Sequence, residues 1–307
     1  MKEESSILYG RVIFGINNIY TVIIGNKEFL CRIKGKVLEE EEKSYNPIAV
    51  GDRVHILPDT HSDKKGWIIN KDKRKSFLVR YNKKRRAPQV IASNVDILVC
   101  VASTNNPPFR PRFTDRLLIS GESGKIEPVI FINKCDLGLS KHDSLRLKNY
   151  RKIGYKVIYG SAKKGDGIKE LLKIINNKVT VFGGQSGVGK TSILNALKPG
   201  LGLKVGEISK KYNRGKHITN FAQMIKLNET TNIIDTPGIR ELDIYNINSK
   251  ELAYYFPEFV NLLGKCSFNS CMHIDEPDCI VKEYVDEGKI HEDRYESYLR
   301  IYESLRE

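Results

Sequence analysis

The segment Gly184–Thr191 constrains the fold of this chain more than any other feature of its sequence. It matches the pattern G-x-x-x-x-G-K-[ST], follows the β-type run Val179–Phe182 and precedes the helix-forming run Ile193–Leu197. In such a strand, loop and helix, backbone N–H groups and the helix amino terminus together face a phosphate anion. A loop of this kind belongs to a parallel sheet with crossover helices, so the sequence predicts an α/β domain around it.

A second motif, Asp235 to Gly238, follows the apolar run Asn232–Ile234. A carboxylate at the end of that strand would hold Mg²⁺ through its water shell, and the Gly238 N–H would contact a γ-phosphate. We expect Lys190 to reach the β- and γ-phosphates and the Thr191 hydroxyl to bind Mg²⁺. Further phosphate contacts are expected from Gly184, Gln185, Ser186, Gly187, Val188, Gly189 and Ser192.

A base-selecting motif lies earlier in the chain, directly after the apolar run Val129–Ile132. Ligand contacts gather at such strand ends in open α/β sheets. Asp136 can accept two hydrogen bonds from the N1–H and amino group of guanine, a donor pair that adenine lacks. We expect the rest of this site to consist of Asn133, Lys134, Ser161 and Ala162, the last two through backbone contact with the guanine oxygen.

The order of the two motifs is the reverse of that in an ordinary GTPase, because the guanine motif precedes the phosphate loop. The sequence therefore predicts a circularly permuted GTPase domain that binds GTP or GDP with Mg²⁺ and hydrolyses GTP. From Ile91 onward strands and helices alternate. We expect strands at 97–102, 129–132, 157–159, 179–182 and 232–234, and helices at 111–120, 143–153, 168–175 and 190–197.

The amino-terminal region has a different sequence pattern. Short β-type runs separated by Gly, Asn and Pro turn signals fill residues 7–69, which predicts a small barrel of oligonucleotide-binding (OB) type, although composition alone would equally fit an SH3-like barrel. Trp67 would suit stacking on a base, but a lone Trp in a strand belongs more often to the core, so we favour the core. The chain length fits two or three domains. From the pattern along the chain we expect three, at 1–72, 73–246 and 247–307.

The formal net charge of +14 favours a polyanionic partner, with nucleic acid first among them. The stretch from Lys71 to Arg86 holds nine Lys or Arg residues against one acidic residue and also contains Phe77 and Tyr81. It predicts a basic linker. Two interpretations of this linker are equally good: it contacts RNA phosphates and bases, or it is only a solvated connector.

Three of the six cysteines gather near the carboxy terminus, where the spacing C-x4-C-x-H-x5-C supplies three sulfurs and one nitrogen. These are the ligands of a closed, structural zinc site, so we expect one Zn²⁺ that stabilises the folding of a mostly helical domain. The expected ligands are Cys266, Cys271, His273 and Cys279, with His291 as an alternative fourth ligand. The apolar positions of 290–305 predict an amphipathic helix that packs on this same domain.

With these residues in place, the chain resembles the circularly permuted, ribosome small subunit-dependent GTPases of the RsgA family over nearly its whole length. The resemblance implies an OB barrel, a central permuted GTPase and a carboxy-terminal zinc domain, which is the partition already reached. It also implies a role in late maturation of the small (30S) ribosomal subunit, with GTP hydrolysis stimulated by that particle.

The first switch departs from the family pattern Gly-Arg-His-Thr-Thr-Thr, because this chain has Ile218 and Asn220 on either side of Thr219. Alignment with the middle threonine makes Thr219 the expected ligand of Mg²⁺ and the γ-phosphate. His217 is expected to orient the attacking water, as is proposed for the matching family histidine, although contact with RNA phosphate is nearly as good an interpretation. Ile239 stands where a Ras-like protein has glutamine close by, so intrinsic hydrolysis should be slow.

The sequence as a whole predicts a cytoplasmic, monomeric GTPase that binds rRNA of the small subunit, hydrolyses GTP and departs. The rival hypothesis is an RNA-binding assembly checkpoint in which GTP is structural and hydrolysis negligible. Residues 1–10 lack the pattern of a secretory signal, and the apolar runs are far shorter than a bilayer span. We therefore expect no membrane partner, and no DNA partner.

Overall fold

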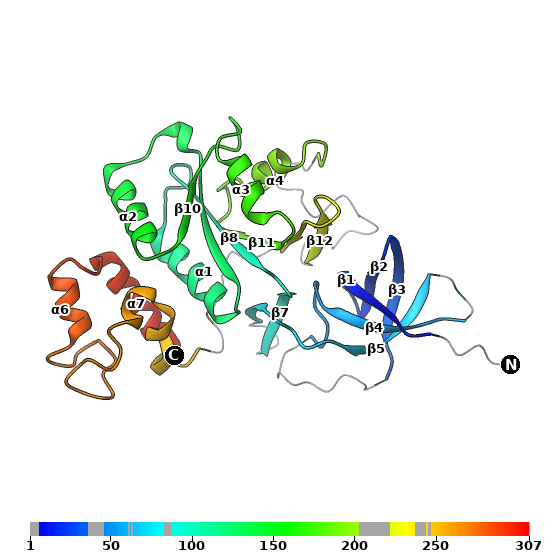
Figure 1. Ribbon diagram of the computed structural model, residues 1–307, viewed down its shortest axis with the longest axis horizontal. Helices are drawn as coiled ribbons and strands as arrows, with labels where there is room; N and C mark the ends of the chain where they lie inside the picture. Colours follow the sequence, from blue (N-terminus) through cyan, green and yellow to red (C-terminus); the bar gives the residue numbers. More distant parts are fainter. Residues whose placement is uncertain are drawn as a thin grey trace.

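The computed structural model describes residues 6–35, 46–60, 62, 64–82, 87–202, 222–236, 244 and 247–306. Three regions follow one another along the chain: a barrel, a central sheet flanked by helices, and a helical carboxy-terminal region (Figure 1). This architecture confirms the predicted fold class. None of the helices within the described ranges is long and apolar enough to cross a membrane.

Five strands close the amino-terminal barrel, since β1 pairs with both β2 and β4 while β5 joins β3 to β4. Side chains alternate along these strands, and the inward set, including Val12, Cys31 and Ile68, is fully buried. The barrel strands are β1 (Leu8–Ile16), β2 (Ile19–Ile24), β3 (Lys27–Ile33), β4 (Arg53–Pro58) and β5 (Lys65–Lys71).

Trp67 lies on the outside of this barrel and not in its core. Its side chain is 42% exposed, whereas its neighbours Gly66 and Ile68 are buried. The alternation of the strand gives the inward positions to Gly66 and Ile68, so Trp67 must point outward. The prediction of a core Trp is therefore wrong.

The expected basic linker is partly folded. A hairpin of β6 (Phe77–Asn82) and β7 (Ala87–Ser93) occupies most of it, and Leu78 and Val90 are buried in the core that they share with the central sheet. The Phe77 N–H donates to the carbonyl of Gly124 at the end of α1 (3.0 Å), which ties the hairpin to the central domain. The solvated connector is therefore not what this stretch forms where it is described.

The central sheet has the strand order β10-β9-β8-β11-β13-β12, parallel except for β12. The five predicted strands and four predicted helices all lie within three residues of their expected bounds. These elements are β8 (Ile97–Ser103), α1 (Pro111–Ser123), β9 (Glu127–Asn133), α2 (Lys141–Lys152), β10 (Lys156–Tyr159), α3 (Ile168–Ile175), β11 (Val179–Gly184), α4 (Lys190–Leu197), β12 (Gln223–Lys226) and β13 (Asn232–Asp235).

Among the residues that the structure describes, one β pairing joins the barrel to the central sheet, between Phe14 of β1 and Gln223 of β12. Gln223 pairs on its other side with Asp235, the last residue of β13. One sheet of eleven strands therefore runs from the far edge of the central domain into the barrel.

The carboxy-terminal region packs its helices around a core that includes Phe256, Phe259 and Tyr298. Its last helix is amphipathic and packs on this core, as the sequence predicts for residues 290–305. The same helix also lies beside α1 (Figure 1). The elements are the 3₁₀ helix η2 (Ser249–Tyr255), α5 (Pro257–Val260), α6 (Ile280–Asp286) and α7 (Glu292–Arg306).

Candidate functional site: a nucleotide pocket and a metal centre

Asn133 joins the guanine motif to the phosphate loop. It ends β9, and its side chain is 2% exposed. Its amide nitrogen donates to the carbonyl of Val188 in the phosphate loop (2.8 Å), and its amide oxygen accepts from the N–H of Ala162 (2.9 Å). One buried side chain thus holds three segments that are far apart in sequence at the same edge of the sheet.

Lys134 makes a second link between the two motifs. It adopts a left-handed backbone conformation with φ 62°, and its ammonium donates to the carbonyl of Gly187 (2.8 Å) and to that of Asn106. The Thr104 hydroxyl donates to the Lys134 carbonyl (2.8 Å), so the loop after β8 supports this residue. Sequence reasoning missed Thr104 and Asn106, because nothing in the sequence indicates a long-range contact of that loop.

Asp136 lies just after Lys134 in the short 3₁₀ helix η1 (Cys135–Leu137) and is half-exposed. A hydrogen bond from Ser161 lowers the pKa of its carboxyl group, and Lys164 and Lys163 act in the same direction. The carboxylate is therefore ionised at neutral pH, as acceptance of two guanine hydrogen bonds requires.

The phosphate loop follows β11 and ends at Gly189, the N-cap residue of α4. The Lys190 ammonium donates to the carbonyls of Gly184 (2.5 Å) and Gln185 (2.8 Å), so it lies folded over the loop where phosphate oxygens would bind. Thr191 and Ser192 occupy the first turn of α4, and Ser186 lies in the loop between Gln185 and Gly187.

Asp235 faces Lys190 from the end of β13. Burial raises the pKa of its carboxyl group to about 6, and the positive charge of Lys190 opposes that shift. A nearby cation would stabilise the ionised form of this buried carboxyl group, which fits its predicted role in holding Mg²⁺. Thr236 follows it and is buried, with a hydroxyl that has no hydrogen-bond partner in the structure described.

Three of the predicted residues, His217, Thr219 and Gly238, lie outside the described residues. The other predicted nucleotide residues gather at the carboxyl ends of the parallel strands β9, β11 and β13 and in the loop after β10. Their contacts with a nucleotide remain predictions.

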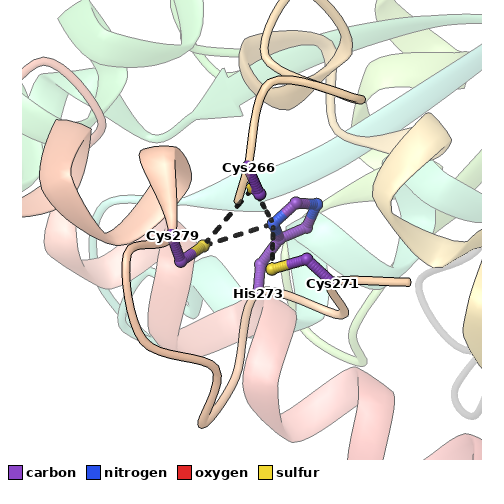
Figure 2. A group of neighbouring side chains, drawn as sticks. All are labelled: Cys266, Cys271, His273 and Cys279. Atoms are coloured by element: carbon purple, nitrogen blue, oxygen red, sulfur yellow. Dashed lines mark hydrogen bonds between the residues drawn. The ribbon is translucent and has the colours of Figure 1, made fainter. Parts of the chain in front are cut away.

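The expected zinc ligands form one cluster (Figure 2), in which all four ligand atoms lie within 4.8 Å of one another. The Nδ1 atom of His273 is 3.3–3.5 Å from the three sulfur atoms, and the sulfurs of Cys266 and Cys279 are 3.9 Å apart. Bonds of about 2.3 Å to sulfur and about 2.0 Å to nitrogen give tetrahedral edges of about 3.8 Å between sulfurs and about 3.5 Å between sulfur and nitrogen. The four side chains therefore fit a tetrahedral zinc ion.

The surroundings of the cluster orient its ligands. Burial lowers the pKa of His273, which favours the neutral ring that a metal requires. The Tyr295 hydroxyl donates to the His273 carbonyl (2.8 Å), and the Glu276 carboxylate accepts from the N–H groups of Met272 (2.7 Å) and Ile274 (2.9 Å). His291, the alternative ligand, is outside the cluster of ligand atoms and accepts a hydrogen bond from the N–H of Asp293.

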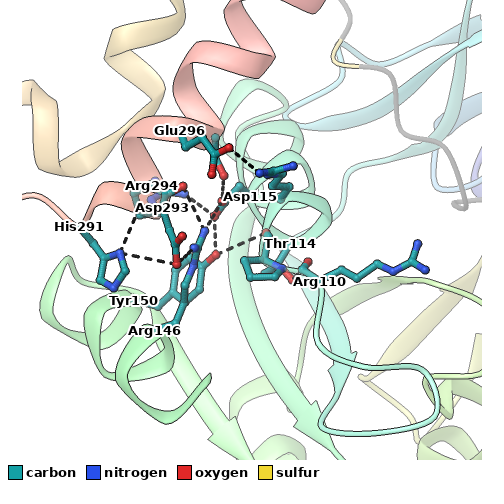
Figure 3. Close-up of polar contacts among 12 residues, drawn as sticks. Arg110, Thr114, Asp115, Arg146, Tyr150, His291, Asp293, Arg294 and Glu296 are labelled. Carbon is teal, nitrogen blue, oxygen red and sulfur yellow. Dashed lines mark hydrogen bonds and ion pairs between the residues drawn. The ribbon is translucent and has the colours of Figure 1, made fainter. Parts of the chain in front are cut away.

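A buried ionic cluster joins the carboxy-terminal region to the central domain (Figure 3). Arg294 of α7 is fully buried and donates to Asp115 of α1 (2.6 Å) and to Glu258 of α5 (2.6 Å). Asp115 also accepts from Tyr150 and Arg146 of α2. Burial alone would lower the pKa of Arg294, but Glu258 and Asp115 hold it well above its usual value. The guanidinium therefore stays charged, and its bond to Asp115 ties the carboxy-terminal region to the central domain.

A phosphate loop and an upstream guanine motif that meet at one edge of a parallel sheet define a circularly permuted GTPase. The family model for the RsgA GTPase matches residues 71–245. This is more than half of the chain, and the chain belongs to that family.

Known relatives match most of this chain. It is 42% identical over 297 residues to a protein of Borreliella burgdorferi named "Small ribosomal subunit biogenesis GTPase RsgA", covering 96% of this chain and 95% of that one. A protein of Flavobacterium psychrophilum with the same name is 41% identical over 290 residues, or 92% and 89% of the two chains.

Two crystal structures share the whole architecture. YjeQ from Thermotoga maritima is 33% identical with a TM-score of 0.76, covering 98% of this chain and 99% of that one. YloQ, described as a circularly permuted GTPase, is 29% identical with a TM-score of 0.73, covering 100% and 97%.

Proposed function

We propose that this protein hydrolyses GTP during late maturation of the small ribosomal subunit and binds the rRNA of that particle. The names of its relatives support the process. The observation that supports the chemistry best is the pair of hydrogen bonds made by the Asn133 side chain, because they link the base-selecting segment to the phosphate loop at one edge of the sheet.

In the proposed cycle, Asp136 selects guanine and the loop from Gly184 to Ser192 holds the phosphates. Mg²⁺ would be bound by the Thr191 hydroxyl and, through water, by Asp235, while Lys190 leaves its two loop carbonyls for the phosphates. Bound Mg²⁺ supplies charge neutralisation at the β- and γ-phosphates. Thr219 and Gly238 would close on the γ-phosphate in the GTP state.

The zinc cluster would serve folding and docking and not catalysis, because four protein ligands leave no open position on the metal. We assign Cys266, Cys271, His273 and Cys279 as its ligands. The division into a barrel at 1–72, a GTPase at 73–246 and a zinc domain at 247–307 is part of the same proposal, as are a monomeric state and a cytoplasmic site of action beside the ribosomal particle.

GTP turnover measured with purified small subunits, with large subunits and with neither tests this function. We expect slow turnover of the protein alone, acceleration by small subunits and no acceleration by large ones. Turnover that stays negligible with small subunits would instead support an assembly checkpoint in which GTP is structural.

His217 is the residue that we assign to orienting the attacking water. His217→Ala should leave GTP affinity nearly unchanged and lower turnover stimulated by small subunits at least about 10-fold, since an oriented proton acceptor contributes factors of roughly 10² to 10⁴. Titration of labelled GTP and single-turnover assays with subunits measure the two quantities. Unaltered stimulated turnover would reject the assignment.

A further inference from the structure

A cavity of about 460 Å³ lies where the barrel, the β6–β7 hairpin and the central sheet meet. Figure 1 shows β1, β7 and β12 at this junction. Small-molecule sites in proteins have volumes of roughly 300–1,000 Å³ and occur preferentially between domains. None of the described nucleotide residues lines the cavity, but Thr236, which directly follows Asp235, does. Its size and position are therefore those of a ligand site beside the nucleotide pocket.

One wall of this cavity is a row of residues across four neighbouring strands. β1 pairs with β12 and β12 with β13, and the row one residue beyond those pairs consists of Gly15, Ala222 and Thr236. Tyr20 of β2 pairs with Gly15 and extends the row, and all four residues line the cavity. A Cβ built on Gly15 would lie 2.8 Å from the Tyr20 ring, so the ring packs directly on the backbone of β1. An occupant of the cavity would therefore contact the barrel and the end of β13 together.

Thr236 gives the cavity a hydrogen-bonding group that has no partner. The residue is 6% exposed, and within the described structure its hydroxyl makes no hydrogen bond. Buried polar groups are nearly always bonded to protein, water or a ligand. We therefore expect this hydroxyl to bond to whatever occupies the cavity.

Another wall carries a cation that is paired with a neutral amide. Arg80 of β6 donates Nε and one terminal nitrogen to the Oε1 atom of Gln89 on β7, at 3.2 Å and 3.1 Å. Burial lowers the pKa of Arg80, and among the described residues no carboxylate forms an ion pair with it. A guanidinium has further N–H donors beyond these two bonds, and its strongest partners are oxyanions. Arg80 is therefore suited to an anionic group in the cavity.

The cavity also has an aliphatic lining, from Ile48, Val90 and Ile91. We propose that it binds a small organic anion, whose apolar body packs on these side chains and whose carboxylate, sulfonate or phosphoryl group binds Arg80. The occupant also contacts Thr236 and so biases the position of the segment that begins at Asp235. This regulatory effect rests on the proposed function, because that function makes Asp235 a ligand of Mg²⁺ through water.

Two fluorescent probes that differ in one charged group test the binding. Anilinonaphthalene sulfonate (ANS) carries a sulfonate, and N-phenylnaphthylamine (NPN) has the same ring systems without it. The full-length protein is first saturated with GDP and Mg²⁺, so that the predicted nucleotide pocket is filled. Each probe is then titrated by its fluorescence. We expect both to bind saturably, because both fit the aliphatic lining of the cavity.

Matched variants of Arg80 separate charge from apolar contact. Arg80→Gln should weaken ANS binding about 10- to 150-fold, the range for a hydrogen bond to a charged group, and change NPN binding by less than about 2-fold. Arg80→Lys keeps the charge, so its ANS affinity should lie between those of Arg80→Gln and the wild-type protein. Arg32→Gln is the control, because Arg32 is exposed and does not line the cavity. An unchanged NPN affinity shows that the cavity of each variant is intact.

Wild-type ANS affinity of Arg80→Gln, equal losses of both probes in that variant, or ANS binding that never saturates would overturn the site. The regulatory effect is tested by repeating the ANS titration with a non-hydrolysable GTP analogue in place of GDP. The two ANS affinities should differ at least about 5-fold, and equal affinities would overturn that effect. Turnover of GTP with small subunits, measured without a probe, tests the proposed function separately, so the site and that function can fail independently.

Discussion

Gly189 occupies a position that tolerates no side chain. A Cβ atom built there would lie 2.3 Å from the amide nitrogen of Asn133, and the residue has φ 94°. The close approach lets Asn133 reach the Val188 carbonyl, so the glycine is required by the contact that joins the two motifs. The contact between the two motifs therefore requires that residue 189 has no side chain.

Gly189→Ala should therefore weaken GTP binding by at least about 10-fold, because Asn133 must move and leave buried polar groups unpaired. Gly200→Ala is a matched control, since Gly200 has φ 95° with nothing within 4 Å of its built Cβ. Both variants carry the backbone strain of about 1–2 kcal/mol, but only the first disturbs the pocket. Fluorescent GTP titration compares them, and equal affinities would contradict the argument.

Local motifs are what allowed the candidate nucleotide site to be predicted from the sequence. The phosphate loop and the guanine motif depend on glycines and short polar runs next to buried strands, and these signals act within ten residues or so. Trp67 was predicted wrongly because its exposure depends on which face of the strand the barrel closes on. Asp115 and Arg294 gave no signal, because their contact joins residues that are 179 positions apart.

Among the elements, the segment between η2 and α7 should depend most on the proposed zinc ion. Its described residues place three sulfurs and a nitrogen in a tetrahedral arrangement, while Tyr295 and Tyr298 of α7 hold the carbonyls of the loop that carries His273. The loop has little apolar packing of its own between Cys266 and Cys279, apart from the ligands themselves. Its conformation should therefore depend on the ion.

Removal of zinc should unfold this region and leave the nucleotide pocket intact. Cys271→Ser should lower the zinc content from one ion per chain and make residues 247–306 sensitive to limited proteolysis, with GTP affinity changed by less than about 3-fold. Cys100→Ser is a control, because Cys100 is buried in the central sheet away from the cluster. Protease resistance of the zinc-free region would count against a structural metal.

The contact between α1 and α7 depends on charges that are shielded from water. Arg294→Ala should destabilise the protein by about 3–5 kcal/mol, because Glu258 would remain buried without its partner and Asp115 would lose one of its two buried arginines. Arg112→Ala removes an ion pair with Glu296 whose two side chains are 49% and 42% exposed, and should cost less than about 1 kcal/mol. Midpoints of denaturant unfolding measure both, and similar losses would refute the distinction.

At the scale of the whole molecule, the nucleotide pocket has a backbone connection to the barrel. Gln223 pairs with Asp235 on one side and with Phe14 on the other, so two pairings lead from the expected magnesium carboxylate to β1. On the opposite side, α1 leads from the loop that holds Lys134 to the ionic cluster on α7. Both outer regions therefore attach to elements that border the pocket.

This arrangement predicts that the bound nucleotide sets the affinity for the small subunit. Binding with a non-hydrolysable GTP analogue should be tighter than with GDP by roughly 5- to 150-fold, the usual range of coupling between two sites. We expect the γ-phosphate to set the orientation of the zinc domain and hydrolysis to release its hold. Co-sedimentation with purified subunits gives both affinities, and equal values would contradict the coupling.

The pairing of Phe14 with Gln223 also has a consequence for anyone who shortens the chain. β12 ends the central sheet, and within the described residues the barrel pairs with its outer edge at Gln223. A fragment that starts after the barrel would present bare N–H and C=O groups along that edge, which is a template for other copies to add strands. Such a truncated protein should aggregate in solution, even though it still contains every residue predicted to bind the nucleotide.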